Sequence, residues 1–178
     1  LDDQSGQEML KVTRLSAKFD IMPFFKGKIS ISSVQLFGFN INLRKETPDS
    51  PPNFKFVLDA FASKDTVKKE NSLDLRINSI LIRRGRMSYH VLSEEETPGK
   101  FNAKHIQLQN IIANISLKAL SKDSLNLGIK RLSLDEKASG FSLKKMSLKL
   151  VANNKQTNID NFTIELPETS LKLDTIHL

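Results

Sequence analysis

The feature that most constrains the fold is a break in hydrophobic alternation that recurs along the chain. In residues 29–36, two isoleucines alternate with polar residues, two serines follow, and the apolar residues resume out of phase. The pattern is apolar, any, apolar, polar, polar, apolar, any, apolar. Its other full copies lie at 10–17, 75–82, 101–108, 127–134, 141–148 and 171–178, and a partial copy lies at 157–164.

A helix does not explain this pattern, because at 100° per residue its four apolar positions form no common stripe. On a strand, the two halves face opposite sides unless a β-bulge at the polar pair supplies an extra residue. Bulges at the same level of successive strands would curl a sheet into a trough. The alternative is a strand buried on both faces. We favour the bulge, which we expect near Ser32-Ser33, Asn78-Ser79 and Lys130-Arg131.

The later copies recur at intervals of 14–16 residues or about twice that, which fits one strand and a turn. Apolar runs are separated by turn-rich segments at 121–124, 135–140 and 153–158 and by loops at 44–53 and 93–100. Phe54 to about Ala62 has helical spacing and predicts a short helix over one end of the sheet. Gly38 and Gly85 are candidates for a second kink or a close backbone approach. We therefore predict one mostly β domain over 1–178, an antiparallel meander of bulged strands curled into a groove or taco-like sheet.

Composition limits the function classes. Apolar residues make up 39% of the chain, enough for a core, but no run reaches the ~18 residues of a membrane span. Cysteine is absent, so disulfides and cysteine-bound metals are excluded. The net charge of +7 would favour binding to anionic partners. The alternative is that the charge is spread over the surface and only keeps the protein soluble. The chain begins at Leu1 without a methionine, so we expect a fragment of a longer protein. It ends at Leu178 inside a copy of the pattern, so we expect an unpaired edge strand where further repeats of the same chain dock.

The search for reactive groups is mostly negative. His90, His105 and His177 are far apart in the sequence and have no partner at metal-ligand spacing, so we interpret each as a surface residue. No phosphate loop, nucleophile elbow or carboxylate pair stands out. We predict no enzyme activity, no metal and no cofactor. Arg83, Arg84 and Arg86 are candidate anion contacts, which we expect at the solvent-exposed tip of a hairpin.

If the bulges exist, one set of apolar residues shares a concave face and forms a candidate lipid groove. Binding acyl chains requires apolar area rather than catalytic groups. Two other classes stay open: a structural or adhesive β-sandwich without a groove, and a polyanion binder that uses the arginines. Nucleic acid is disfavoured because Trp is absent and Tyr89 is the only tyrosine. The groove residues are Ile31, Val34, Leu36, Ile77, Ile80, Ile82, Ile106, Leu108, Ile129, Leu132 and Leu134.

The first third of the chain resembles the N-terminal portion of the AsmA/TamB family of Gram-negative envelope proteins. The resemblance rests on Pro23, Phe24 and Phe25 with Gly27, then on the segment 29–36, then on Asn53-Phe54 leading into the predicted helix. The later segments "INSILIRRGRMSY" and "IKRLSL" are similar to the repeats that extend such proteins. These motifs are degenerate patterns and not invariant catalytic motifs.

The resemblance implies a location and a role. Members of the family are tethered to the inner membrane by an N-terminal helix and extend through the periplasm as a curled β-sheet. Their apolar groove is associated with phospholipid transport towards the outer membrane, and the TamB branch with assembly and secretion of outer-membrane proteins. On this basis the expected partners are phospholipid acyl chains and outer-membrane assembly proteins, and the membrane anchor is expected to precede Leu1.

Overall fold

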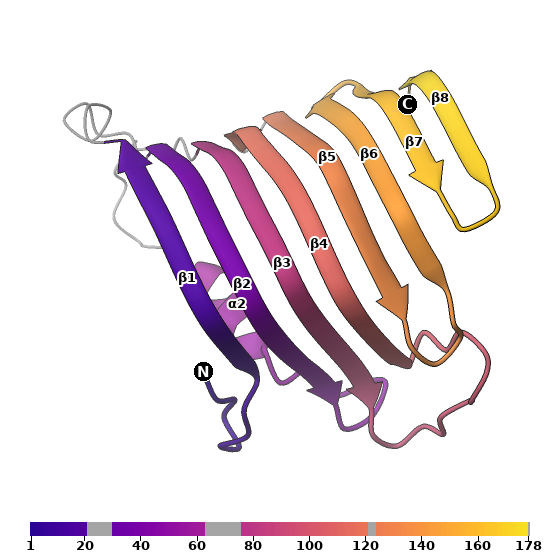
Figure 1. Cartoon of the computed structure of the whole chain (residues 1–178). Helices are drawn as coiled ribbons and strands as arrows, with labels where there is room; N and C mark the ends of the chain where they lie inside the picture. The colour runs from indigo at the N-terminus through magenta and orange to yellow at the C-terminus, as the bar shows by residue number, and fades with distance from the viewer. Residues whose placement is uncertain (21–29, 63–75, 121–123, 178) are drawn as a thin grey trace.

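A computed structural model describes residues 1–20, 30–62, 76–120 and 124–177 of the chain. All eight of its strands belong to one sheet, in which they follow one another in chain order (Figure 1). The elements are β1 (Leu10–Asp20), β2 (Ser30–Lys45), α2 (Lys55–Ala62), β3 (Arg76–Val91), β4 (His105–Leu120), β5 (Ser124–Glu136), β6 (Ser142–Asn153), β7 (Thr157–Glu165) and β8 (Ser170–His177). The mostly β fold and the helix within 54–62 are therefore confirmed.

Strand direction departs from a pure meander at one position. Neighbouring strands of the described residues are antiparallel except for β2 and β3, which are parallel. Parallel neighbours need a long crossover connection, and the segment from 46 to 75 that contains α2 provides it. Residues 23–27, which carry part of the family resemblance, residues 121–123 of a predicted turn-rich segment, and the last residue of the chain lie outside the described residues.

The predicted bulges are confirmed at all three polar pairs. At each polar pair, the bulged strand has one more residue than its neighbour between two successive paired positions. In β3, for example, Ile77 and Ile80 lie opposite Leu117 and Ile115 of β4. The polar pairs of β2 and β3 lie side by side, so the extra residues form a line across these strands. Further bulges occur at the polar pairs 144–145 in β6 and 160–161 in β7.

A second line of irregularities crosses the sheet nearer to the other end of β2, β3 and β4. Gly38, Arg84 and Asn110 have positive φ values of 64°, 55° and 54°. The register also shifts around the latter two residues. In β1, by contrast, the polar pair of the pattern causes no shift, because the residues on either side of Thr13 keep their register with β2.

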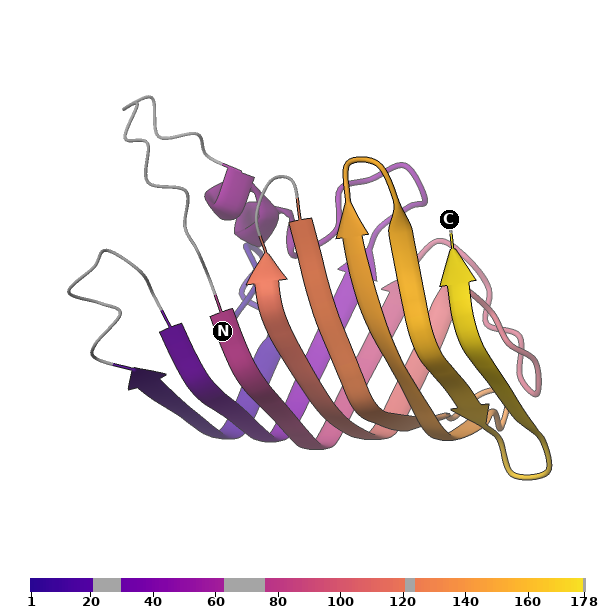
Figure 2. The same cartoon turned by 90° about the horizontal axis from the view of Figure 1, so that it is seen from above.

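The sheet is curled into a trough that is open on one side (Figure 2). In Figure 1 the helix α2 lies behind the sheet, and Figure 2 shows it on the open side of the trough. The accessible surface is 12817 Å², whereas a compact protein of this mass exposes roughly 8,700 Å². The excess is expected of a single curved layer. Among the described residues, no helix combines the length and hydropathy needed to cross a membrane.

Candidate functional site

Strand β4 shows how the apolar residues are distributed over the sheet. Leu117, Ile115, Ala113 and Ile111 alternate with polar or exposed residues, so their side chains lie on one face. Residues that are directly opposite on neighbouring strands share a face as well. Each of these four residues therefore belongs to a row that runs across the sheet.

Two of the rows contain an apolar residue from every strand. The row through Leu117 is Phe19, Ile31, Ile77, Leu117, Leu127, Leu150, Ile159 and Ile176. The row through Ala113 is Leu15, Leu36, Ile82, Ala113, Leu132, Met146, Ile164 and Leu171. Between them runs a shorter row of Ala17, Val34, Ile80, Ile115, Ile129 and Leu148. We call the face that carries these rows the apolar face.

The apolar face continues beyond the second line of irregularities. Ile111 lies opposite Gly85, and the ring of Phe39 covers that glycine. From Phe39, alternation along β2 leads to Ile41 and Leu43 on the same face. Ile41 belongs to the row Leu10, Ile41, Met87 and Leu108, and Leu43 begins the row Leu43, Tyr89 and Ile106.

The register thus brings the eleven candidate groove residues together on the apolar face, with Leu134 placed there by alternation from Leu132. All eleven are half-buried, and none is fully buried. At the β1 edge, by contrast, Leu15 and Phe19 are 65% and 62% exposed. Because side chains converge on the inner surface of a curled sheet and splay on the outer one, we infer that the apolar face is the concave one.

The opposite face is mostly polar. One of its rows is Ser116, Gly128, Lys149, Asp160 and Thr175, and another is Ser147, Thr163 and Lys172. Each row of this kind passes through positions that alternate with those of the apolar face. A sheet with one apolar and one polar face is the arrangement expected when only one side contacts apolar material.

The candidate anion contacts do not lie where we expected them. Arg83, Arg84 and Arg86 are exposed, but they belong to the middle of β3 and not to a hairpin tip. Strand β3 continues to Val91, well past the pattern copy that ends at Ile82, so the arginines lie inside the strand. The guanidinium of Arg84 lies 5.2 Å from the ring centroid of Phe37, so part of its charge interacts with an aromatic face.

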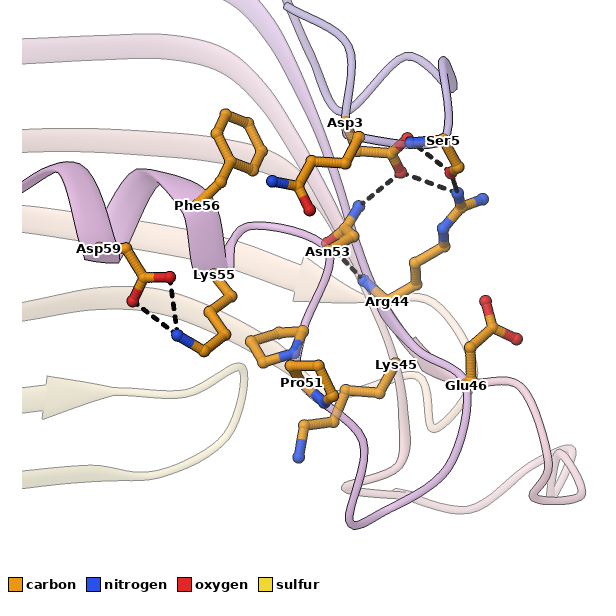
Figure 3. A pocket seen from close by; sticks show the side chains of 12 residues that line it. Asp3, Ser5, Arg44, Lys45, Glu46, Pro51, Asn53, Lys55, Phe56 and Asp59 are labelled. Carbon is orange, nitrogen blue, oxygen red and sulfur yellow. Dashed lines mark hydrogen bonds and ion pairs between the residues drawn. The ribbon is translucent and has the colours of Figure 1, made fainter.

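A cleft of about 340 Å³ lies between the N-terminal turn, the end of β2 and α2 (Figure 3). Asp3 is its centre: the carboxylate accepts hydrogen bonds from the Ser5 and Gln7 N–H groups and is 2.8 Å from Nη2 of Arg44. Asn53 bonds the same carboxylate and the backbone of β2. Hydrogen bonds from Gln7, and then from Ser5, hold the pKa of Asp3 far below its usual range. These charged and polar groups bind one another. We therefore interpret them as structural interactions that hold the N-terminal turn and the start of α2 to the end of β2, and not as a ligand site.

A second carboxylate closes the turn between β5 and β6. Glu136 is buried and accepts hydrogen bonds from the Ser139 hydroxyl and from the N–H groups of Gln107, Ala138 and Ser139. Burial by itself would raise the pKa of Glu136, but these bonds, from Ser139 foremost, lower it to about 2. The turn predicted at 135–140 is thus held by an ionised side chain at neutral pH.

Our interpretation of the histidines was wrong for two of the three. His90 and His105 lie directly opposite each other on β3 and β4, with their Nδ1 atoms 3.0 Å apart. The carboxylate of Glu96 lies within 4.0 Å of both. Fifteen residues separate the two histidines in the sequence, so spacing alone does not reveal them. The available signal was that His90 precedes and His105 follows the acidic loop at 93–100.

The chain was compared with protein-family models, with curated proteins and with solved structures, and no match was found.

Proposed function

We propose that this chain is a non-catalytic, lipid-binding segment of an AsmA/TamB-like envelope protein, in which phospholipid acyl chains lie against the apolar face. The observation that supports the proposal is the pair of apolar rows that cross all eight strands without a polar interruption. In this proposal the segment lies in the periplasm, tethered to the inner membrane by a segment outside this sequence. It serves phospholipid transport and the biogenesis, assembly or secretion of outer-membrane proteins, as the family resemblance suggests.

The dimensions of the rows suit an acyl chain. Eight strands at a spacing of about 4.8 Å give a row of roughly 34 Å. Because the hydrocarbon core of a bilayer is about 30 Å thick, one acyl chain spans about 15 Å. Each buried methylene contributes about 0.8 kcal/mol. A row therefore offers room for a whole acyl chain and needs no reactive group to bind it.

The experiment is a titration with a fluorescent phospholipid analogue. Ile80→Asp and Leu132→Asp each place a charge on the apolar face, whereas Leu81→Asp makes a matched change one residue away. Leu81 pairs with Gln35 and Asn114 and so belongs to the polar face. We expect saturable binding by the native protein and by Leu81→Asp. We expect at least about a tenfold loss in the two other variants, because an unpaired charge facing an acyl chain costs several kcal/mol.

Circular dichroism of the same variants decides between the proposal and the alternative, a structural or adhesive β-sandwich. Half-buried positions on an open face can still hydrate an aspartate, so Ile80→Asp and Leu132→Asp should stay folded. If both unfold while Leu81→Asp stays folded, the apolar face is a closed core and the sandwich is supported. Native protein that fails to bind the analogue, or equal loss in all three variants, would also overturn the proposal.

A further inference from the structure

The geometry points to a metal site formed by His90, His105 and Glu96, which would take a divalent transition-metal ion of the zinc class. It lies at the ends of β3 and β4 that the 92–104 connection joins. Both histidines belong to the polar face, since they alternate with Tyr89 and Ile106 of the apolar face. The site is thus separate from the surface proposed for lipid and does not depend on that proposal.

The distances between the three ligand atoms suit a metal. Nδ1 of His90 lies 3.0 Å from Nδ1 of His105, and Oε1 of Glu96 lies 3.8 Å and 4.0 Å from these two nitrogens. A triangle with these sides has a circumscribed circle of radius about 2.1 Å. Zinc bonds to histidine nitrogen and carboxylate oxygen are also about 2.0–2.2 Å long. Tetrahedral geometry would set the nitrogens about 3.4 Å apart, so shifts of a few tenths of an ångström suffice.

The hydrogen bond that Nε2 of His105 makes favours the same conclusion. Its Nε2 lies 2.8 Å from the carbonyl oxygen of Glu94, to which it donates a hydrogen bond. In the neutral imidazole of this buried side chain, Nδ1 then carries the lone pair, and it faces His90. Metal-bound histidines commonly donate their second N–H to a carbonyl group in this way. Two lone pairs cannot face each other at 3.0 Å, so either a proton on His90 or a metal ion must lie between the rings.

The connection that carries Glu96 is held in shape by interactions between its own residues. Lys104 forms a 2.6 Å ion pair with Glu94, and the Asn102 side chain donates to the carbonyl of Glu95. A cleft of about 270 Å³ adjoins Glu96 and His105, and it gives solvent access for a fourth ligand. Three protein ligands and a water molecule form the usual open zinc site. Nitrogen ligands exclude Ca²⁺ and Mg²⁺ as the preferred ions.

The experiment is a calorimetric titration of metal-free protein with Zn²⁺ alone, repeated with Co²⁺ to observe the visible absorption of a four-coordinate ion. We expect one metal ion per chain. Because even outer-shell changes reduce metal affinity 10–100-fold, we expect at least about a 100-fold loss for His90→Gln and about tenfold or more for Glu96→Gln. His177→Ala is the matched control: this exposed histidine on β8 bonds Asn158 far from the site, and its loss should change nothing.

A second measurement keeps the test decisive if His90→Gln does not fold. Glu96 is exposed, so Glu96→Gln should keep the fold and still lower the affinity. Nitrogen NMR of the native protein should show Zn²⁺ shifting the Nδ1 resonances of His90 and His105 but not that of His177. The proposal is overturned if no metal binds at 100-micromolar concentrations, if Glu96→Gln binds like the native protein, or if His177→Ala abolishes binding.

Discussion

The ring of Phe39 occupies the space in which a side chain on residue 85 would begin. A Cβ built on Gly85 would lie 2.3 Å from Cε1 of Phe39 and 3.0 Å from Cβ of Ile111. Phe39 and Ile111 are 7% and 8% exposed and are among the few buried hydrophobic side chains of the described residues. The glycine therefore lets an aromatic ring of β2 cover β3, at the second line of irregularities in the sheet.

Gly85→Ala should destabilise the protein by about 1–3 kcal/mol, the usual cost of overpacking a buried site. The measurement is the free energy of unfolding in urea. Gly128→Ala is the matched control on another strand, because its Cβ would meet only the Ser116 hydroxyl, which can rotate away. Its effect should stay below about 1 kcal/mol. Equal stabilities for the two variants would show that Phe39 does not depend on residue 85.

Deleting single residues tests the bulges. Without Lys130, Ile129 and Leu132 alternate regularly around one polar residue, so both stay on the apolar face and the loss in stability should be about 1 kcal/mol or less. Lys149 lies between Leu148 and Leu150, in a stretch of β6 that has no extra residue and keeps a regular register with β5. Its deletion moves one half of β6 to the wrong face and should unfold the protein. Thermal unfolding of the two deletion variants makes the comparison, and an equal effect of the two deletions would contradict the bulge.

The bulges were predictable because they leave a mark in the sequence itself. A polar pair between apolar residues, such as Ser32-Ser33 or Lys130-Arg131, indicates a bulge within a single strand. The same sequence pattern recurs in several strands. Once the bulges are placed, alternation on either side of them predicts which residues lie on the apolar face. Helix α2 was predictable for the same reason, since its apolar spacing is local.

The cross-strand relationships were not predictable in this way. Whether His90 meets His105 depends on the register of β3 against β4, and that register is set by residues with positive φ such as Arg84 and Asn110. In a sequence, neither arginine nor asparagine predicts a left-handed backbone conformation as reliably as glycine does. The parallel pairing of β2 with β3 likewise depends on where the crossover segment returns to the sheet.

Acid should weaken the fold through Glu136. Its pKa is about 2 in the folded protein, below the ordinary value of 4.5, so the ionised side chain stabilises the fold fully above about pH 4.5. This contribution is lost as the pH falls from 4.5 towards 2. Glu136→Gln should cost about 2–3 kcal/mol at pH 7, and its difference from the native protein should vanish near pH 2.

Urea unfolding at pH 7, 4 and 2 measures this effect, with the exposed Glu168→Gln as control. The lowered pKa of Asp135, which accepts hydrogen bonds from Asn110 and Ser142, will leave Glu136→Gln with some acid sensitivity. A constant difference between Glu136→Gln and the native protein at all three pH values would show that the carboxylate charge is not what stabilises the turn.

Strand β8 should make the protein self-associate. Within the described residues it pairs only with β7, so its other edge presents backbone N–H and C=O groups, and Leu171 and Leu173 beside that edge are 48% and 39% exposed. Such an edge is a template for pairing with another strand, and lysine on an edge strand discourages the pairing. We expect sedimentation to show association that increases with protein concentration. The double variant Leu171→Lys/Leu173→Lys should remove this association.

Leu15→Lys makes a similar change at the opposite edge, on β1, and should leave the association intact. A protein that stays monomeric at every concentration, or one whose association only Leu15→Lys removes, would show that β8 is not the adhesive edge.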